Sequence, residues 1–143
     1  MKSIVKNKKA SFNYHILKTY EAGIALNGAE VKSIRLGKVS IKSSYGKIVD
    51  GEIYLFDMHI SPYDKAPCSI DPKRERKLLL HKGQIRRIEN EIQKKGMTLI
   101  PIEVYLEREL VKVKIALVIG KKKFEKRDKI IEREQKREIR KNL

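Results

Sequence analysis

The sequence predicts a mainly β protein with helices (α+β): a small closed antiparallel barrel of roughly five or six strands whose two or three helices plug its open ends. Three observations predict this class. Short apolar or alternating runs recur along residues 1–119, turn residues separate them, and they do not alternate with helices as a parallel sheet requires. Beyond Gly120, apolar side chains become too sparse for a core. The chain therefore divides into a barrel domain, 1–119, and a basic tail, 120–143.

The first strand and the first helix follow the N-terminal segment. Residues 12–20 are aromatic and β-branched, which is typical of a strand, and Gly23 opens a short apolar continuation. Asn27 is expected to cap a short helix, because Glu30 stands three residues later in the capping-box position. That helix is expected to end at Gly37, since glycine often follows the last helical residue.

Four further runs predict two hairpins. These strands cover residues 45–49, 52–56, 100–106 and 111–119. Asp50-Gly51 separates the first two runs and is a strong hairpin signal, while a turn near Arg108-Glu109 joins the last two. Residues 61–72 hold three prolines and several polar residues, so we expect an exposed loop there.

A longer helix is predicted over residues 74–95, because apolar side chains recur there at steps of three and four. Gly83 is expected to mark a break within it, and Gly96 to end it. In this reading the cluster Arg74-Glu75-Arg76-Lys77 opens the helix, where basic residues oppose the helix dipole. Contact with phosphate is one explanation of that cluster, and a solvated first turn is the other.

The charge points to a polyanionic partner. The chain has 34 Lys and Arg against 18 Asp and Glu, a net charge of +16. Such an excess costs self-repulsion unless a partner such as RNA relieves it. The tail is expected to be disordered alone and helical on RNA, since acid–base pairs lie four residues apart in it. A tail that serves solubility only is the alternative.

Several classes of protein are disfavoured. No run of about 18 apolar residues could span a membrane, and the basic N-terminus lacks the apolar stretch of a secretion signal. A single cysteine, Cys68, suits the reducing cytoplasm. The histidines are scattered, no glycine-rich phosphate loop occurs, and pairing Cys68 with the distant His81 as nucleophile and base has little support. We therefore expect no enzyme, no cofactor and no metal.

Aromatic side chains interleaved with Lys and Arg favour RNA binding. They are Tyr14, Tyr20, Tyr45, Tyr54, Tyr63 and Phe124. Tyr14 and Tyr54 have a competing explanation as core or strand-packing residues. Phe124 stands among cations with no core nearby in sequence, so it is the better candidate for stacking on a base.

Five segments together resemble the SsrA-binding protein family, also called small protein B. They are GIALNGAEVKSIRLG (23–37), HISPY (59–63), PKRERKLLLHK (72–82), TLIP (98–101) and GKKKFEKR (120–127). They occur in the family's order along nearly the whole chain. The chain departs from the family pattern at Phe12, where the family often has His, at Gln84, where it has Glu, and at Glu125, where it has Asp.

The resemblance implies a barrel of the oligonucleotide-binding (OB) type that binds the tRNA-like domain of transfer-messenger RNA. The family delivers this RNA to stalled ribosomes for trans-translation, which rescues the ribosome and tags the incomplete polypeptide. It also implies a cytoplasmic protein, monomeric in the RNA complex, whose tail enters the empty messenger channel as a helix near the decoding centre. A ribosomal structural protein and a general single-strand RNA-binding barrel are the alternatives.

The candidate RNA-binding residues of the barrel come from this match and from the basic cluster. They are Asn7, Lys8, Lys9, Gly28, Glu30, Lys32, Arg35, Arg74 and Arg76. The candidate ribosome-binding residues of the tail are Gly120, Lys121, Lys122, Lys123, Phe124, Lys126, Arg127, Lys129, Arg133, Lys136 and Arg137. Glu30 has two possible roles, because a carboxylate repels phosphate: it accepts bonds from RNA bases or sugars, or it caps a helix.

Overall fold

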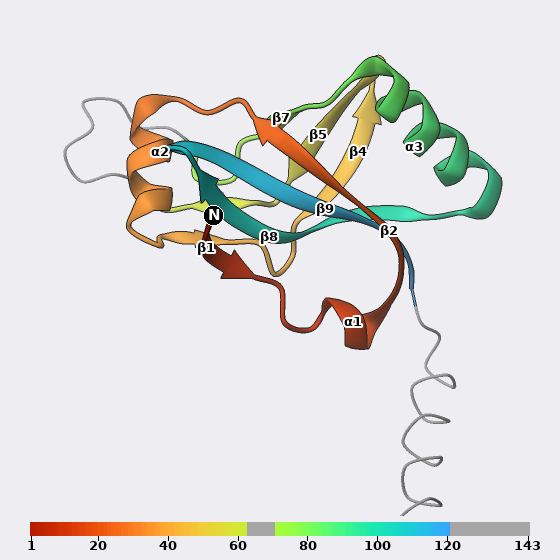
Figure 1. Cartoon of the computed structure of the whole chain (residues 1–143), viewed down its shortest axis with the longest axis horizontal. Helices are drawn as coiled ribbons and strands as arrows, with labels where there is room; N and C mark the ends of the chain where they lie inside the picture. Colours follow the sequence, from red (N-terminus) through yellow and green to blue (C-terminus); the bar gives the residue numbers. More distant parts are fainter. Residues whose placement is uncertain (63–70, 121–143) are drawn as a thin grey trace, which may run out of the picture.

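The computed structural model describes residues 1–62 and 71–120 and consists mainly of β strands (Figure 1). The strands are β1 (Lys2–Lys6), β2 (Tyr14–Ile24), β3 (Val39–Ser40), β4 (Tyr45–Val49), β5 (Glu52–Phe56), β6 (His59–Ile60), β7 (Arg76–Leu79), β8 (Thr98–Glu107) and β9 (Leu110–Gly120). The helices are α1 (Ala10–Asn13), α2 (Gly28–Arg35) and α3 (Lys82–Lys95). The predictions for Tyr63, for Cys68 and for the tail beyond Gly120 lie outside the described residues.

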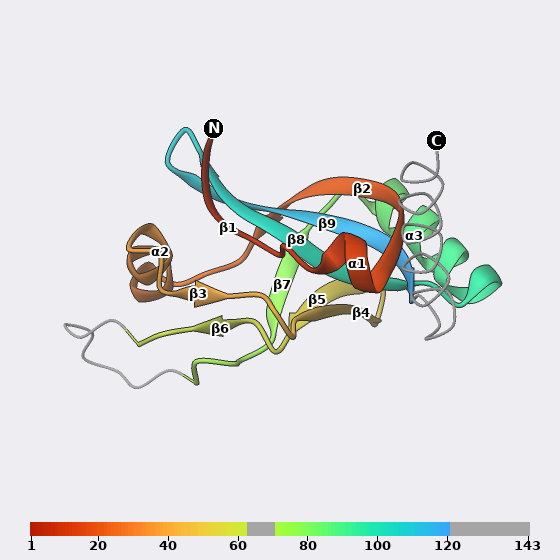
Figure 2. The same ribbon diagram turned by 90° about the horizontal axis from the view of Figure 1, so that it is seen from below.

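Seven strands form one antiparallel sheet in the order β1-β8-β4-β5-β7-β2-β9, and β9 pairs in turn with β8. The two-residue strands β3 and β6 pair with each other in a second, small sheet. Figure 2 shows α2, β3 and β6 gathered at one end of the molecule and α3 at the other. The two helices therefore stand at opposite ends of the strands.

The main core lies between the inward faces of the strands and is closed at its ends by α2 and α3. Ile53, Leu55 and Leu78 are fully buried there, with Ile34 from α2 and Ile88 from α3. A second, smaller core lies on the outer face of β8 and β9. It consists of Ala10, Ile100, Ala116 and Val118, with Tyr14, Tyr45 and Ile102 packed against it. Tyr14 thus has the packing role that competed with RNA contact.

Both predicted hairpins are present. Asp50 and Gly51 have φ angles of 52° and 78°, and Arg108 and Glu109 have φ angles of 49° and 69°. Two successive residues with positive φ make a turn whose twist matches that of the strands it joins. The strands around the second turn, β8 and β9, are paired along nearly their whole length.

Helix α2 begins and ends as predicted. Asn27 Oδ1 accepts the Glu30 N–H at 2.9 Å, and Glu30 Oε1 accepts the Asn27 N–H at 3.1 Å, which is a complete capping box. Gly37 follows the helix with a φ of 78°, a conformation that few other residue types adopt readily. The local sequence signals are therefore sufficient to place this helix.

The prediction of one helix over residues 74–95 is wrong in its first part. Residues Arg76–Leu79 form β7, which pairs with β2 on one side and β5 on the other. Helix α3 begins only at Lys82, so Gly83 lies in its first turn rather than at a break, while Gly96 ends it with a φ of 60°. The edges of β2 and β5 both need a hydrogen-bonding partner at this point. Pairing with these distant strands therefore outweighs the helical spacing of the apolar residues.

The N-terminal segment also differs from the prediction. Strand β1 pairs with β8, and α1 takes up residues Ala10–Asn13, so the first predicted strand begins at Tyr14 and runs without interruption to Ile24. Neither β1 nor the short β3–β6 pair has a clear strand signal in the sequence. Within the part of the chain that the structure describes, no helix is long and apolar enough to cross a membrane.

Candidate nucleic-acid interface

A transverse row of residues crosses four neighbouring strands on the outer face of the sheet. Tyr105 of β8 is paired with Lys112 of β9, Lys112 with Gly23 of β2, and Gly23 with Leu79 of β7. Leu79 is 54% exposed, which is unusual for a leucine in the middle of a sheet. Because Gly23 has no side chain, Leu79 can pack closely over the backbone of β2: a Cβ at Gly23 would lie 3.3 Å from the Leu79 Cβ.

Beside this row lies a groove of about 760 Å³ between β2, β7, β9 and the start of α3. Its polar lining comprises Thr19, Glu21, Glu52, Lys77, His81, Lys82, Gln84 and Lys112. The groove exists because β2 and β7 are paired only at Gly23–Leu79 and Ile24–Leu78. After Leu79 the chain leaves the sheet towards α3 and opens a hollow along β2.

The groove combines cations with a helix N-terminus. Lys77 and Lys112 project from the sheet, and Lys82 stands in the first turn of α3. The Nζ atom of Lys77 lies 3.7 Å from a carboxylate oxygen of Glu52, and that of Lys112 lies 3.5 Å from Glu107. These contacts hold the ammonium groups near the surface. Backbone N–H groups at the start of a helix also favour anions.

Tyr105 forms the fixed end of the row. Its side chain is 1% exposed. Burial raises the pKa of Tyr105 to about 12, and the nearby carboxylates of Glu21 and Glu107 add to the shift. The hydroxyl therefore keeps its proton at neutral pH, so Tyr105 adds no charge beside its pairing partner Lys112.

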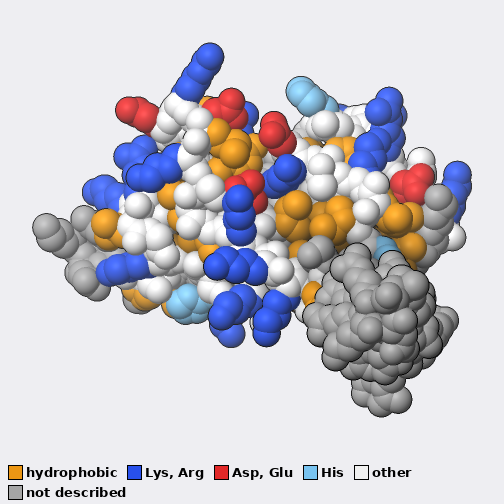
Figure 3. All heavy atoms as spheres, turned by 60° about the horizontal axis from the view of Figure 1, so that its bottom comes forward, with side chains coloured by type: hydrophobic (Ala, Val, Ile, Leu, Met, Phe, Trp, Pro, Cys, Tyr) orange, Lys and Arg blue, Asp and Glu red, His pale blue; other side chains and the backbone are white. Residues whose placement is uncertain are grey.

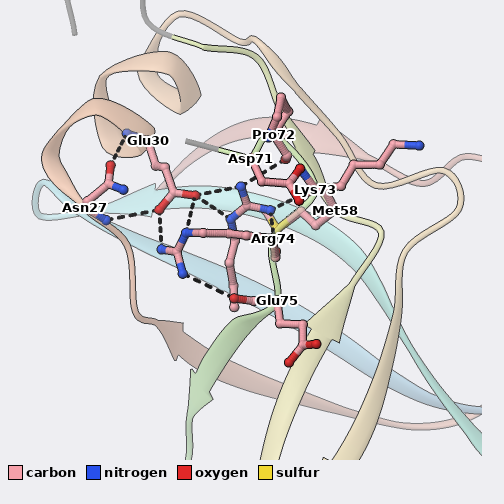
Figure 4. A network of polar contacts seen from close by, with 9 residues as sticks. Asn27, Glu30, Met58, Asp71, Pro72, Lys73, Arg74 and Glu75 are labelled. Carbon is pink, nitrogen blue, oxygen red and sulfur yellow. Dashed lines mark hydrogen bonds and ion pairs between the residues drawn. The ribbon is translucent and has the colours of Figure 1, made fainter. Parts of the chain in front are cut away.

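A second set of charged residues, shown in Figure 4, lies inside the protein near α2. Glu30 is 4% exposed, and its carboxylate accepts hydrogen bonds from the backbone N–H of Asn27 and from the side chains of Arg74 and Arg76. Burial alone would raise the pKa of Glu30, but the hydrogen bonds from Arg74, Asn27 and Arg76 outweigh it and leave the pKa below its ordinary value. Glu30 is therefore ionised, and both oxygens of its carboxylate accept hydrogen bonds.

Arg76 is the cationic centre of this network. Its side chain is fully buried, and Nε donates to Glu30 Oε2 at 2.6 Å. Its other nitrogens donate to the carbonyl oxygens of Met58, Arg74 and Pro72. Burial lowers the pKa of Arg76, although the bond to Glu30 opposes that shift. The network fixes β7 and the segment before it against α2.

The predicted barrel residues thus fall into separate groups. Arg76 and Glu30 are turned inward, because each charge is buried against the other, and Glu30 has the helix-capping role, one of the two expected for it. Arg74 is half-buried, since it shares the Glu30 carboxylate. The basic cluster does not open a helix, so the conflict with a helix dipole does not arise.

The remaining predicted side chains are at the surface. Gly28, Lys32 and Arg35 are exposed on α2, and Arg35 donates to the Glu109 carbonyl in the β8–β9 turn at 3.2 Å. Lys8 and Lys9 are exposed after β1, while the Asn7 N–H is bonded to the Ile102 carbonyl at 2.8 Å. Figure 3 shows Lys and Arg side chains spread widely over the face that carries β1 and α1.

Gly120 ends β9 opposite Tyr14 and is exposed. The other predicted tail residues, from Lys121 to Arg137, lie outside the described residues. The described part of the chain therefore ends beside the start of β2. Among residues 1–62 and 71–120, no group of three or more His, Cys, Asp or Glu side chains is placed to hold a metal ion.

Of the residues that line the groove, sequence reasoning singled out Tyr20 and Lys77 and missed most of the others. Glu21, Leu79 and Lys112 come from three strands, and only the pairing register brings them together. Leu79 stands in a run of three leucines, which resembles core. The one usable signal was Gly23 within an otherwise strong strand, since glycine in a strand often marks close approach of another chain.

Comparison with known proteins gives consistent matches. The family model described as SmpB protein matches residues 4–143. An SsrA-binding protein of Lachnoclostridium phytofermentans is 52% identical over 144 residues, covering 100% of this chain and 94% of that protein. One of Caldicellulosiruptor saccharolyticus is 49% identical, with 100% and 91% covered. A solved chain from "tmRNA-SmpB: a journey to the center of the bacterial ribosome" is 48% identical, has a TM-score of 0.69, and matches over 83% of this chain and 85% of its own.

Proposed function

This chain belongs to the SmpB protein family, and on that premise we propose that it binds transfer-messenger RNA and delivers it to stalled ribosomes for trans-translation. It acts as a non-enzymatic adaptor. The RNA is recognised by the body, 1–119, through its tRNA-like domain, and the ribosome by the tail, 120–143. A role on the ribosome places the protein in the cytoplasm.

The body is proposed to be a closed OB-type barrel. The pairings support this, because they run from β8 through β4, β5, β7, β2 and β9 and return to β8. Closure leaves the outer faces of the strands as the surface on which nucleic acid can lie. The groove and its transverse row belong to that outer surface.

The groove is the observation that best supports an RNA-binding surface on the body. Lys77, Lys82 and Lys112 line a hollow that also presents the exposed Leu79, whose side chain packs over Gly23. Cations bind phosphates, whereas an apolar side chain beside them suits the flat face of an unstacked base. This combination fits a folded RNA better than a regular duplex, whose bases are stacked inside.

The exposed predicted residues extend this surface, and the buried ones support it. Lys32 and Arg35 on α2 and Lys8 and Lys9 after β1 are proposed to contact phosphates. Arg76 and Glu30 are proposed to act indirectly, because their ion pair holds α2 and β7 in place. Phe124 is proposed to stack near the decoding centre after the tail enters the messenger channel as a helix.

Binding of a tRNA-like RNA at two salt concentrations tests the proposal. Neutralising 6–10 phosphates should cost roughly 10³–10⁵ in affinity between about 50 and 200 mM salt. A chain ending at Gly120 should still bind this RNA but fail to release stalled ribosomes. Equal affinity of the full chain for unstructured oligonucleotides would contradict the proposal and indicate a general single-strand binder.

A further inference from the structure

A second hollow, of about 400 Å³, lies between the start of β4 and the later turns of α3. We call it the β4–α3 hollow. Its apolar floor includes Ile48, Met97 and Leu99, and its polar side chains include Lys47, Glu89, Gln93 and Thr98. It shares no lining residue with the groove at the start of α3. An apolar hollow of this size with a few polar groups is the usual form of a small-ligand site.

One wall of the hollow is the Tyr45 side chain, and Phe56, which does not itself line the hollow, supports it from the neighbouring strand. The rings of Tyr45 and Phe56 are stacked, with centroids 5.5 Å apart and planes 12° apart. These residues lie directly opposite each other on β4 and β5, so the pairing register fixes their geometry. Tyr45 also packs against the small outer core around Ile100. Its ring is therefore held in place before any ligand binds.

A cation stands over this pair. The Nζ atom of Lys47 lies 5.6 Å from the Tyr45 ring centroid and 5.9 Å from that of Phe56. Lys47 is an exposed residue on β4, so its ammonium group can reach a phosphate at the mouth of the hollow. Ring, cation and apolar floor together match a nucleotide: the base on the aromatic wall and the phosphate on the lysine.

We propose that the β4–α3 hollow holds one unpaired base of an RNA. The net charge of +16 favours a nucleic acid over an apolar peptide as its occupant. Glu89 can accept a hydrogen bond from an exocyclic amine, and Gln93 can donate and accept along the edge of a base. This site is additional to the groove, and it rests on the proposed function only in taking RNA as the ligand class.

The two sites lie near the two ends of α3. Lys82 lines the groove and Gln93 lines the hollow. Along the axis of α3 these two residues are roughly 16 Å apart, at a rise of about 1.5 Å per residue. The sites are therefore separable by mutation. Substitution of Lys112 affects the groove without touching the lining of the hollow.

A short single-stranded RNA that carries one 2-aminopurine tests the proposal, because stacking on an aromatic ring quenches this base. The full-length protein should quench its fluorescence. Tyr45→Leu should weaken binding of this RNA roughly tenfold and abolish the quenching, whereas Tyr45→Phe retains both. Lys47→Ala should weaken binding several-fold, and Lys47→Arg should restore it.

Tyr14→Leu is the matched control, because Tyr14 packs against the same outer core but does not line the hollow. It should leave quenching unchanged, and thermal unfolding shows that each variant is folded. Lys112→Ala should weaken binding of the tRNA-like RNA yet keep the quenching of the short one, so failure of the groove and failure of the hollow are distinguishable. Absence of quenching with the unsubstituted protein, or equal affinity of Tyr45→Leu, would overturn the proposal.

Discussion

The Glu30 carboxylate and the Arg76 guanidinium form a buried ion pair that joins α2 to β7, with Nε and Oε2 2.6 Å apart. Glu30 is 4% exposed and Arg76 is fully buried. The surrounding carbonyl groups satisfy the remaining Arg76 donors. A pair so arranged is costly to break from one side, because the other charge then stays buried without a partner.

Glu30→Gln should therefore lower the free energy of unfolding by about 3 kcal/mol, since glutamine keeps the size of the side chain but leaves the Arg76 charge uncompensated. Urea denaturation measures the change. Glu109→Gln is the control, because Glu109 is exposed in a turn. A loss of stability equal to that of the control would show that the pair contributes nothing.

The same carboxylate predicts how stability depends on pH. The pKa of Glu30 is lower in the folded protein than its ordinary value, because the bonds from Arg74, Asn27 and Arg76 outweigh the effect of burial. Its contribution is therefore fully present above the unfolded pKa of about 4.3 and is lost as the pH falls through the lower folded pKa. Urea denaturation between pH 6 and pH 3 should show a shallower acid decline for Glu30→Gln than for the unsubstituted protein.

Lys112→Ala should weaken binding of the tRNA-like RNA several-fold and reduce the slope of log affinity against log salt by about one unit, because one phosphate contact is lost. Salt titrations of the binding constant measure both. Lys42→Ala removes an exposed lysine outside the groove and serves as the control. If both variants behave alike, the effect comes from net charge rather than from the groove.

Leu79→Ala separates binding from folding. Leu79 is 54% exposed, so its truncation should change the free energy of unfolding by no more than about 0.5 kcal/mol. Its loss should still weaken RNA binding by about 1 kcal/mol, or roughly fivefold, if it packs against a base. Leu36→Ala, at a leucine that is 62% exposed on the other end of the molecule, should leave binding unchanged.

The elements that were predicted correctly have their causes close by in sequence. The α2 capping box spans four residues, and each hairpin turn is decided by two. Glycine after a helix, at Gly37 and Gly96, likewise acts through a local backbone conformation. These signals involve only neighbours, so no knowledge of the fold is required to use them.

Strand β7 and the groove could not be predicted in the same way. Arg76 occupies an inward position that normally holds an apolar side chain, and Glu30, 46 residues earlier, together with the carbonyl oxygen of Met58 makes this possible. Because the sequence near Arg76 does not reveal these distant partners, the spacing of apolar residues over 74–95 favoured a helix. The groove likewise depends on which strands are neighbours, and its exposed Leu79 cannot be told from the buried Leu78 beside it by residue type.

The bond between α2 and β7 also has a consequence for local opening. If α2 detaches alone, the Arg76 charge stays buried without its carboxylate, and if β7 detaches alone, the Glu30 charge loses the Arg76 guanidinium. The least costly excursion releases both together and lets water reach both charges at once. The backbone amides of these two segments should then exchange their hydrogens with solvent as one cooperative unit, although more than a quarter of the chain lies between them.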